Sequence, residues 1–532
     1  MLRVAGYARS WHIILGEKIM RFGLDRSKTN QLIRGLIIGV LVGVIVSTFR
    51  LLIEYELKLV TVAYRLMHQN AWLLVPWVAG SVIIALFLGW LVKRNPAIKG
   101  SGIPQIEGQL SGDYEESWWP VLWQKFVGGV LAIGSGLFLG REGPSIQLGA
   151  AVGQGFAEVR HDEPLARRIC IATGSAAGLS AAFNAPIAST MFVLEEVYHN
   201  FSPLVWLSAF VSALTSNFVS LNFFGLTPVL HVDYSESLPL AQYGQLIGLG
   251  VVLGILGRIY QENLLHMDSI YGWLKKIPSE YYPVVPFIIV IFIGWWWPET
   301  LGGGNSLIVS FNHVNPSIWL FVGLLLLRFV FSMISYGSGL PGGIFLPILT
   351  LGAVIGGLYA SIMVSLGLMP GKFVINFIIY AMAGYFAGIG KAPFTAILLI
   401  TEMVGSLEHL MPLAVVSLVA YVVVDMLNGS PIYASLLDKL LKRDRHLSNS
   451  TQDVIQTTVF AGSMLDGTQV RDFNWPESCL LYSIQRGERQ IIPHGDTEIK
   501  AGDTLLVSVA PRMRHSAFVR IINAAQKIKI NG

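Results

Sequence analysis

The sequence predicts an all-α polytopic membrane protein with a small soluble α/β domain at its C-terminal end. Of its 532 residues, 53% are hydrophobic and 13% are charged, about half the charged fraction of roughly 25% that is usual in soluble domains. Nearly all long apolar runs lie between residues 31 and 435, whereas residues 438–532 have a soluble composition. We therefore expect residues 31–437 to lie in a lipid bilayer.

Residues 1–30 are basic and show no cleavable signal peptide. No small-residue cleavage site follows an apolar run there. Positively charged segments of membrane proteins stay on the cytoplasmic side, so we expect a cytoplasmic N-terminal segment. The net charge of the whole chain is only +4, which does not suggest nucleic acid as a partner. The basic residues are Arg3, Arg9, Lys18, Arg21, Arg26 and Lys28.

Apolar segments of about bilayer length recur along the membrane region. A helix needs about 20 apolar residues to cross a bilayer. Three further segments, 140–157, 178–195 and 343–358, are shorter or are interrupted by Gly and Pro. Because breaks at membrane depth are tolerated only inside the protein or along a cavity, this pattern favours a transporter or channel over a simple anchor. The candidate spans are 31–53, 75–92, 121–139, 203–223, 244–259, 283–297, 317–334, 374–390 and 411–427.

The membrane region contains an internal repeat. Residues 140–153 and 343–356 share the pattern G-x3-P-x4-G-A-x2-G. Each copy is followed by an Ala-Pro pair and then, nine residues after the proline, by a glutamate, Glu195 or Glu402. Chance similarity between glycine-rich helices is the alternative. Secondary transporters are commonly built from two such halves, whose broken helices form the substrate site near the middle of the bilayer.

Three short stretches, which we call the Gly-Pro segments, combine glycine and proline at residues 100–104, 140–144 and 343–347. Each precedes or opens a predicted helix, because proline is favoured in a first helical turn and glycine permits a tight backbone. The first N–H groups of a helix lack partners and carry about half a positive charge. Several such ends that converge would bind an anion without holding it too tightly. The alternative is that these glycines only allow close helix packing.

Glu142 lies in the second Gly-Pro segment, beside a predicted helix start. A carboxylate inside a membrane is costly and marks a candidate functional site. When it is deprotonated, Glu142 can occupy a place built for an anion. When it is protonated, it loses the attraction of the helix end and can swing away, so protons and anions would compete for one place. The alternative is a simple ion pair with Arg141.

Four other polar residues are candidates for a role in transport. Glu195 and Glu196 end a glycine-rich apolar segment near the expected cytoplasmic boundary. One of them can pass protons between the cytoplasm and Glu142, or both are interfacial acids at a helix end. Tyr433 follows the last apolar span and is either an aromatic interface anchor or a hydroxyl donor to an anion. Ser101 is a second candidate donor.

Five motifs together resemble the CLC chloride channel and transporter family. The resemblance implies two inverted-topology repeats with broken helices, at about residues 31–225 and 240–437. It also implies a homodimer with one independent pathway in each subunit. The motifs are GSGIP at 100–104, GREGP at 140–144, AAFNAP at 181–186, GGIFLP at 342–347 and the pair Pro431 and Tyr433.

The resemblance also assigns an anion site to this chain. Ser101 and Tyr433 resemble the side chains that coordinate the central anion in the family. The backbone amides of Ile344 and Phe345 resemble the other donors, and Gly143 falls in the same anion site. Ser101 stands where nitrate-preferring members have proline, and the fluoride-exporting branch departs from both the Ser and the Tyr patterns. The resemblance therefore implies chloride as the transported anion.

Two acids carry the proton prediction. Glu142 resembles the gating glutamate of the family, and Glu196 resembles the inner proton glutamate of the antiporter branch. Channel-type members typically have a neutral residue at the second position. The resemblance thus implies a chloride/proton antiporter, with a gated anion channel controlled by the C-terminal domain as the alternative.

The C-terminal part begins with a polar linker at residues 438–453, and apolar runs alternate with turns in 454–510. The stretch IIPHGDTEIKAGDTLLVSV at 491–509 resembles the C-terminal subdomain of RCK potassium-transport regulators, also called TrkA-C. It implies a cytoplasmic α/β module in residues 454–532 that binds an unidentified small molecule or only stabilises a dimer. Eukaryotic CLC members typically carry CBS domains there, so the tail implies a prokaryotic source and a location in the cell membrane.

The sequence does not support an enzyme, a cofactor or a metal site. It has two cysteines, Cys170 and Cys479, and no nucleophile–base pair or metal-ligand spacing. His494 and Asp496 fit a turn better than a metal site. A potassium transporter would need a carbonyl filter resembling TVGYG, and the sequence contains none. The expected partners are lipid, chloride, protons and a second copy of the chain.

Overall fold

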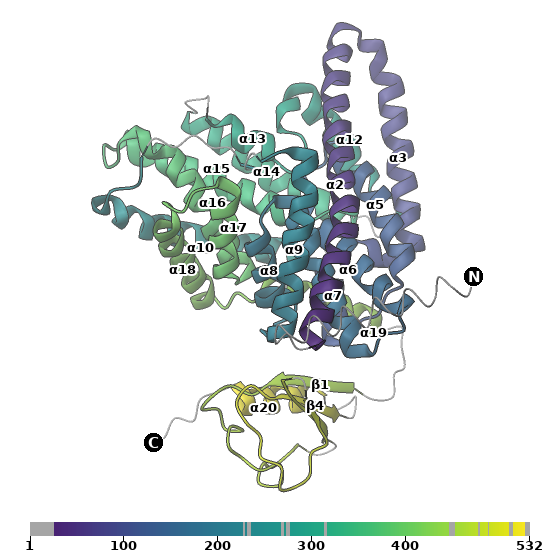
Figure 1. The fold of residues 1–532 in the computed structure, drawn as a ribbon. Helices are drawn as coiled ribbons and strands as arrows, with labels where there is room; N and C mark the ends of the chain where they lie inside the picture. Colours follow the sequence, from purple (N-terminus) through teal and green to yellow (C-terminus); the bar gives the residue numbers. More distant parts are fainter. Residues whose placement is uncertain are drawn as a thin grey trace, which may run out of the picture. The chain divides into compact units, whose positions relative to one another are not determined.

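The computed structural model describes residues 26–445 and 453–526, apart from short gaps (Figure 1). Residues 1–25 of the predicted N-terminal segment and 446–452 of the predicted linker lie outside the described residues. The chain divides at Lys439 into two compact units, which we call the membrane unit and the C-terminal unit. The gaps are residues 200, 227–228, 231–235, 268–270, 273–276, 313–316, 477–478, 488 and 510–513.

The first half of the membrane unit begins with two long helices joined by a short turn (Figure 1). In the first of them, α2, Ile38, Val42 and Val46 are completely buried, whereas Val40 and Val44 are 46% exposed. The spacing of four residues places the buried side chains on one face of the helix. This half contains α2 (Arg26–Gln69), α3 (Leu74–Arg94), α4 (Ile103–Ser111), α5 (Trp118–Gly134), α6 (Glu142–Val159), α7 (Pro164–Phe183), α8 (Pro186–Phe192), a π-helical turn (Val193–Val197) and α9 (Pro203–Phe224).

The second half follows the same plan. Across the described residues of both halves, eight helices are long and apolar enough to cross a membrane. Shorter helices and broken segments lie among them. The second half contains α10 (Tyr243–Leu265), α12 (Val284–Trp296), α13 (Asn305–Ser310), α14 (Ile318–Gly337), α15 (Phe345–Ser365), α16 (Val374–Gly390), α17 (Pro393–Val404), α18 (Leu410–Met426) and α19 (Ile432–Arg445).

Several helix bounds differ from those expected. The span predicted at 31–53 is part of α2, which has 44 residues. The segment predicted at 178–195 is the end of α7 and all of α8, separated at Asn184, which has a left-handed φ of 54°. The segment at 343–358, expected to be short or interrupted, lies from Phe345 onward in a continuous helix of 21 residues, α15. The glycines inside α15 do not interrupt the helix. They allow it to pack closely against a neighbouring helix.

The two halves repeat one packing order. In the first half α6 packs on α7, and α7 packs on α8 and α9; in the second, α15 packs on α16, and α16 packs on α17 and α18. The repeated glycines allow the close approach. A Cβ on Gly149 would collide with the carbonyl of Gly174, and one on Gly356 would collide with that of Phe377. Close packing therefore explains the glycines inside these helices.

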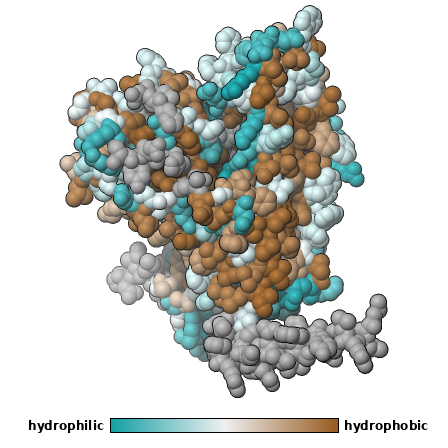
Figure 2. Space-filling view, turned by 45° about the horizontal axis from the view of Figure 1, so that its top comes forward, coloured by the Kyte–Doolittle hydropathy of each residue, from teal (hydrophilic) through white to brown (hydrophobic). Residues whose placement is uncertain are grey.

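The outside of the membrane unit is largely apolar. Figure 2 shows hydrophobic residues covering much of the visible face of the helices. Large apolar side chains on α2, α3 and α10 are exposed, including Leu41 at 46%, Ile83 at 65% and Ile247 at 54%. A soluble protein rarely exposes so extensive an apolar surface, so lipid must cover it.

The C-terminal unit is a small antiparallel sheet with one helix against it. Its strands are β1 (Asp453–Thr458), β2 (Cys479–Arg486), β3 (Arg489–Ile491) and β4 (Thr504–Val509), in the order β1-β4-β2-β3, followed by α20 (Arg514–Gln526). Alternate residues of β4, including Leu505 and Val507, are buried with Ile521 of α20. The Asp503 carboxylate accepts two hydrogen bonds of 2.7 Å from Arg486 and raises the pKa of that guanidinium.

Candidate functional site

The three Gly-Pro segments meet inside the membrane unit. Gly140 and Gly343 exchange two backbone hydrogen bonds of 2.7 Å. The N–H of Gly100 donates to Leu340 at 3.2 Å, and the N–H of Gly342 donates to the carbonyl of Gly100 at 3.0 Å. These short bridges bring together the starts of α4, α6 and α15, which lie far apart in the sequence.

Glycine is required where these segments touch. A Cβ on Gly143 would lie 2.8 Å from Cβ of Ser101. Gly102 has a φ of 87°, and a Cβ there would collide with the Gln147 side chain. The GSGIP and GREGP motifs therefore pack directly against each other. The N-caps of α6 and α15 have no side-chain hydrogen bond, so their first N–H groups remain available to a ligand.

Glu142 begins α6 and is completely buried. Its carboxylate folds back over Gly140, where an added Cβ would lie 2.5 Å from Oε2. The backbone N–H groups of Glu142 and Leu346 lie beside the carboxylate, but neither of its oxygens has a hydrogen bond of ordinary geometry. The carboxylate thus lies between the first turns of α6 and α15, where the helix ends favour a negative charge.

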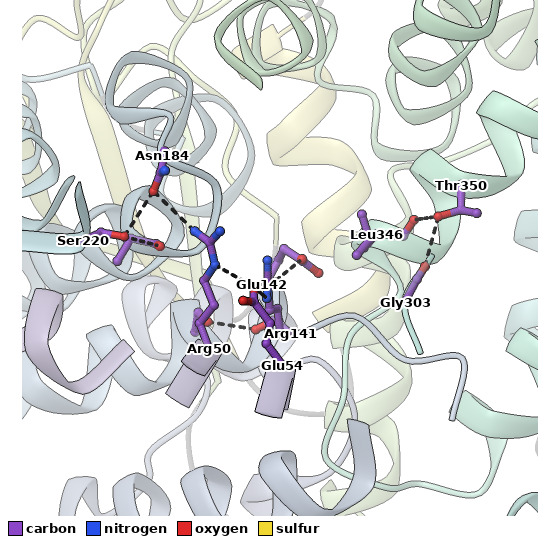
Figure 3. A network of polar contacts seen from close by, with 11 residues as sticks. Arg50, Glu54, Arg141, Glu142, Asn184, Ser220, Gly303, Leu346 and Thr350 are labelled. Atoms are coloured by element: carbon purple, nitrogen blue, oxygen red, sulfur yellow. Dashed lines mark hydrogen bonds and ion pairs between the residues drawn. The ribbon is translucent and has the colours of Figure 1, made fainter. Parts of the chain in front are cut away.

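Arg141 pairs mainly with Glu54 of α2, and not with Glu142 (Figure 3). Its Nη1 lies 2.7 Å from Glu54 Oε1, whereas its Nε lies 3.9 Å from Glu142 Oε1. The second distance is too long for a hydrogen bond. Nε of Arg50 lies 3.0 Å from the same oxygen of Glu54. The ion pair between Arg141 and Glu142 that the sequence allowed is therefore present only as a contact of 3.9 Å.

A cavity of about 1530 Å³ lies next to this network. Arg141 and Leu346, the neighbours of Glu142, line it, and Glu142 itself does not. Thr350 of α15 donates a hydrogen bond of 3.0 Å to the carbonyl of Gly303, which also lines the cavity (Figure 3). Four cations and two acids are among the lining residues, which gives the cavity a positive balance. They are Arg50, Lys58, Arg65, Arg141, Glu54 and Glu299.

The other predicted anion donors lie at or near helix starts: Ser101 before α4, Gly143 in the first turn of α6, and Ile344 and Phe345 at the start of α15. Ser101 is 1% exposed, and its Oγ accepts a hydrogen bond of 3.3 Å from the N–H of Ile103. Its own hydroxyl hydrogen is therefore free for an anion. Ile344 and Phe345, at the start of α15, are buried. Gly143 lies against Ser101.

Tyr433 is completely buried near the start of α19, and its hydroxyl has no hydrogen-bond partner among the residues that the structure describes. A Tyr that anchors a protein at the membrane interface would be exposed there, so burial excludes that alternative. Its ring packs edge-on against Phe192, which also packs against Phe345. Tyr433 lies within electrostatic range of both Glu142 and Glu196.

The neighbouring acids Glu195 and Glu196 have different surroundings. The Glu195 carboxylate accepts hydrogen bonds from the N–H and Oγ1 of Thr395, at 2.8 and 2.7 Å, and from the N–H of Phe394 at 3.3 Å. It therefore caps α17. Glu196 is 4% exposed in the π-helical turn that follows α8. Turns of this kind are frequent at functional sites.

Sequence reasoning missed several charged residues around the site. Lys125 of α5 is completely buried, and its Nζ donates to the carbonyls of Ile98 and Gly100 at 2.9 and 2.7 Å. Glu107 of α4 is buried and acts electrostatically on Glu196. A lysine inside an apolar run is itself a signal, because charges at membrane depth are expensive.

The chain is similar to known protein families and to transporters of established name. A family described as "Voltage gated chloride channel" matches residues 84–425, and the TrkA-C domain matches residues 454–517. The H(+)/Cl(-) exchange transporter ClcA of Vibrio campbellii is 35% identical over 69% of this chain and 81% of its own length. The same transporter of Klebsiella pneumoniae is 33% identical over 68% and 78%.

Solved structures are also similar. The structure of a slow cyanobacterial Cl-/H+ antiporter matches with a TM-score of 0.73 and 28% identity, over 79% of this chain and all of that chain. A eukaryotic CLC transporter matches with a TM-score of 0.65 and 22% identity, over 77% of this chain and 74% of its own. At 22% identity, the similarity to the eukaryotic transporter shows a shared fold and nothing more.

Proposed function

The chain belongs to the voltage gated chloride channel family, and we propose that it exchanges chloride for protons across a cell membrane. Its similar curated relatives carry the name of H(+)/Cl(-) exchange transporters. The observation that carries the proposal is the position of Glu142, a buried carboxylate between the starts of α6 and α15. An anion would occupy this same place.

In the proposed mechanism, Glu142 competes with chloride. The deprotonated carboxylate is an anion and fills the place between the helix ends. Protonation removes its charge and with it the attraction of the helix dipoles. The neutral side chain then leaves, and chloride takes its place. Each passage of an anion is thereby linked to a change in the protonation of Glu142.

The bound chloride would be held by neutral donors. We assign the hydroxyls of Ser101 and Tyr433 and the backbone amides of Ile344 and Phe345 to this role, with Gly143 beside them. The Tyr433 hydroxyl has no other partner, and the hydroxyl hydrogen of Ser101 is not used by Ile103, which donates to its oxygen. Neutral donors bind a halide without trapping it.

Glu196 would supply the protons from the other side of the site. It is buried in the turn that follows α8, and Phe192 at the end of α8 packs against the ring of Tyr433. Glu195 is unsuited to this role because its carboxylate is held by the first turn of α17. We place the basic N-terminal segment and the C-terminal unit on the cytoplasmic side, where the latter would bind a small molecule.

A second copy of the chain would cover one apolar face of the membrane unit. On this face α8 packs on α17 and α9, and α17 packs on α18. Ile187, Phe218, Phe394 and Leu418 are exposed there by 47%, 70%, 66% and 59%. We propose that this face, which we call the α8–α18 face, forms a homodimer.

Exchange is tested with purified protein in sealed vesicles. An outward chloride gradient should drive protons inward against their own gradient, until the proton gradient balances the chloride gradient. A channel, the alternative, would move chloride with no uphill proton movement. Chloride flux without proton movement would therefore refute the exchanger.

A further inference from the structure

The charged network beside Glu142 contains a carboxylate, Glu54, that no step of the proposed exchange uses. Glu54 lies on α2, at the edge of the cavity, and its side chain is 36% exposed. Arg50 and Arg141, which contact it, are 9% and 8% exposed. A single carboxylate oxygen thus bridges two buried guanidiniums (Figure 3).

The network is fixed at its outer end. The Arg50 guanidinium lies 3.8 Å from the centre of the Phe224 ring, and its Nη1 lies 3.4 Å from Asn184 Oδ1. Ser220 donates a hydrogen bond of 3.1 Å to the same oxygen of Asn184. Arg50 in turn holds Glu54, four residues later on the same helix. Arg50 therefore connects Glu54 of α2 to Asn184 at the end of α7 and to Phe224 of α9.

The inner end of the network is the Arg141 side chain, which lies between Glu54 and Glu142. The backbone of Arg141 is held because its carbonyl accepts hydrogen bonds of 2.9 Å from the N–H and the Oγ of Ser145. Within the described part of the chain, its buried Nε has no hydrogen-bond partner, and it lies 3.9 Å from Glu142 Oε1. Among the described residues, the side-chain hydrogen bond of the guanidinium is the one from Nη1 to Glu54, and no hydrogen bond joins it to Glu142.

We propose that Glu54 is a positioning residue that holds Arg141 away from Glu142 and thereby sets the pH at which Glu142 leaves its place. Without the Glu54 charge, Arg141 would pair directly with the ionised Glu142. That form would gain a charge-assisted hydrogen bond, and Glu142 would stay in place down to a lower pH. The inference rests on the proposed exchange, in which protonation of Glu142 admits chloride.

Other charged groups near the two acids do not duplicate this role. Among the described residues, Arg141 is the charged group within ion-pair distance of Glu142, and Arg50 and Arg141 are those within ion-pair distance of Glu54. Lys58, Arg65 and Glu299 line the same cavity, but none of them contacts Arg141 in a described ion pair. Glu299 is therefore a control of equal charge in the same cavity.

The test compares the chloride flux of Glu54→Gln, Glu299→Gln and the unchanged protein in vesicles as a function of pH. We expect the midpoint of the flux–pH curve of Glu54→Gln to move to lower pH by about one unit, the size of shift produced by a charge a few ångströms away. Glu299→Gln should keep the midpoint of the unchanged protein. An unmoved midpoint in Glu54→Gln, or a shift to higher pH, would overturn the proposal.

Two further variants separate this inference from the proposed function and from misfolding. In the Glu142→Ala background, Glu54→Gln should leave the chloride flux unchanged, because the group it acts through is gone. If Glu142→Ala alone keeps the pH dependence, the proposed function has failed, and not only the role of Glu54. Should Glu54→Gln not fold, Glu54→Asp shortens the side chain by one methylene and weakens its contact with Arg141, so a smaller shift of the midpoint in the same direction is expected.

Discussion

Lys125 and Arg328 are buried cations of the membrane unit, and each is held by backbone carbonyls. Lys125 donates to Ile98 and Gly100, and Arg328 donates to Thr300 and Gly302 at 2.5 and 2.9 Å. Such partners offset the cost of burial. Glu142, by contrast, is buried with no good hydrogen bond to either oxygen. A buried carboxylate without hydrogen-bond partners destabilises the fold, so its presence indicates a functional role.

Glu196 and Glu195 offer a matched pair of variants at neighbouring positions. Glu196→Gln should lower proton flux by about a hundredfold, the lower end of what a positioned proton-transfer group contributes, and should spare chloride flux. Glu195→Gln should keep the coupling of protons to chloride, because Glu195 is bound to the start of α17. Both fluxes are measured in one vesicle preparation. Normal proton flux in Glu196→Gln would exclude this residue from the proton route.

Some site residues were predictable from the sequence and others were not. Glu142 stands in a Gly-Pro segment at a helix start, and that local pattern was enough to single it out. Arg50 and Glu54 lie inside a long apolar helix without any motif, and their partner Arg141 is 87 residues further along than Glu54. Nothing local in the sequence shows that these side chains meet.

The nine-residue spacing between proline and glutamate has a physical reason at the level of helices. Glu195, at the end of the α8 segment, caps α17, and Glu402 of α17 accepts hydrogen bonds from the N–H groups of Ala188 and Ile187 at 2.7 and 3.2 Å. The two halves therefore cap each other reciprocally. The sequence revealed the repeated spacing, but it did not reveal that each glutamate serves the helix of the other half.

Loss of either reciprocal cap should destabilise the membrane unit. Glu402→Gln and Glu195→Gln keep one amide oxygen as an acceptor but lose the charge and the second acceptor oxygen at the helix start, so each should cost about 1 kcal/mol. Thermal unfolding in detergent measures the effect as a lower melting temperature. Glu262→Gln, which changes an exposed acid on α10, is the control. A melting temperature unchanged in both cap variants would show that these hydrogen bonds contribute no stability.

Helix bounds were predicted least well where a break depends on one residue. The end of α7 is fixed by Asn184, in a left-handed conformation, and Asn favours that conformation less strongly than Gly does. The segment after α8 continues as a π-helical turn, and periodicity alone does not distinguish such a turn from an α-helix. The glycines of α15 suggested an interrupted helix, but they lie inside a continuous helix at its contact with α16.

At the scale of the whole molecule, the family was predictable because its motifs are local and ordered along the chain. The predicted resemblance to the CLC family and to TrkA-C is confirmed by the family matches. The predicted helical membrane fold with a small C-terminal α/β domain is confirmed by the structure and its similar solved neighbours. The homodimer stays a proposal, because its interface would be formed by the apolar α8–α18 face, which has no sequence motif of its own.

The α8–α18 face makes a prediction about assembly. Leu418→Trp should convert the protein from a dimer to a monomer, because the larger ring overfills a packed interface. Ile83→Trp on α3, which is 65% exposed, should leave the dimer intact because lipid accommodates the ring. Light scattering of the detergent-solubilised protein measures the mass. A dimeric Leu418→Trp variant together with a monomeric Ile83→Trp variant would assign the interface to α3 instead.

The most direct test of the account is the pH dependence of chloride flux in the unchanged protein and in Glu142→Ala. If the ionised carboxylate and chloride compete for the ends of α6 and α15, chloride flux in the unchanged protein should rise as the pH falls, because protonation frees the place. In Glu142→Ala the flux should be independent of pH, and proton transport should be lost. A variant that keeps the original pH dependence would contradict the account.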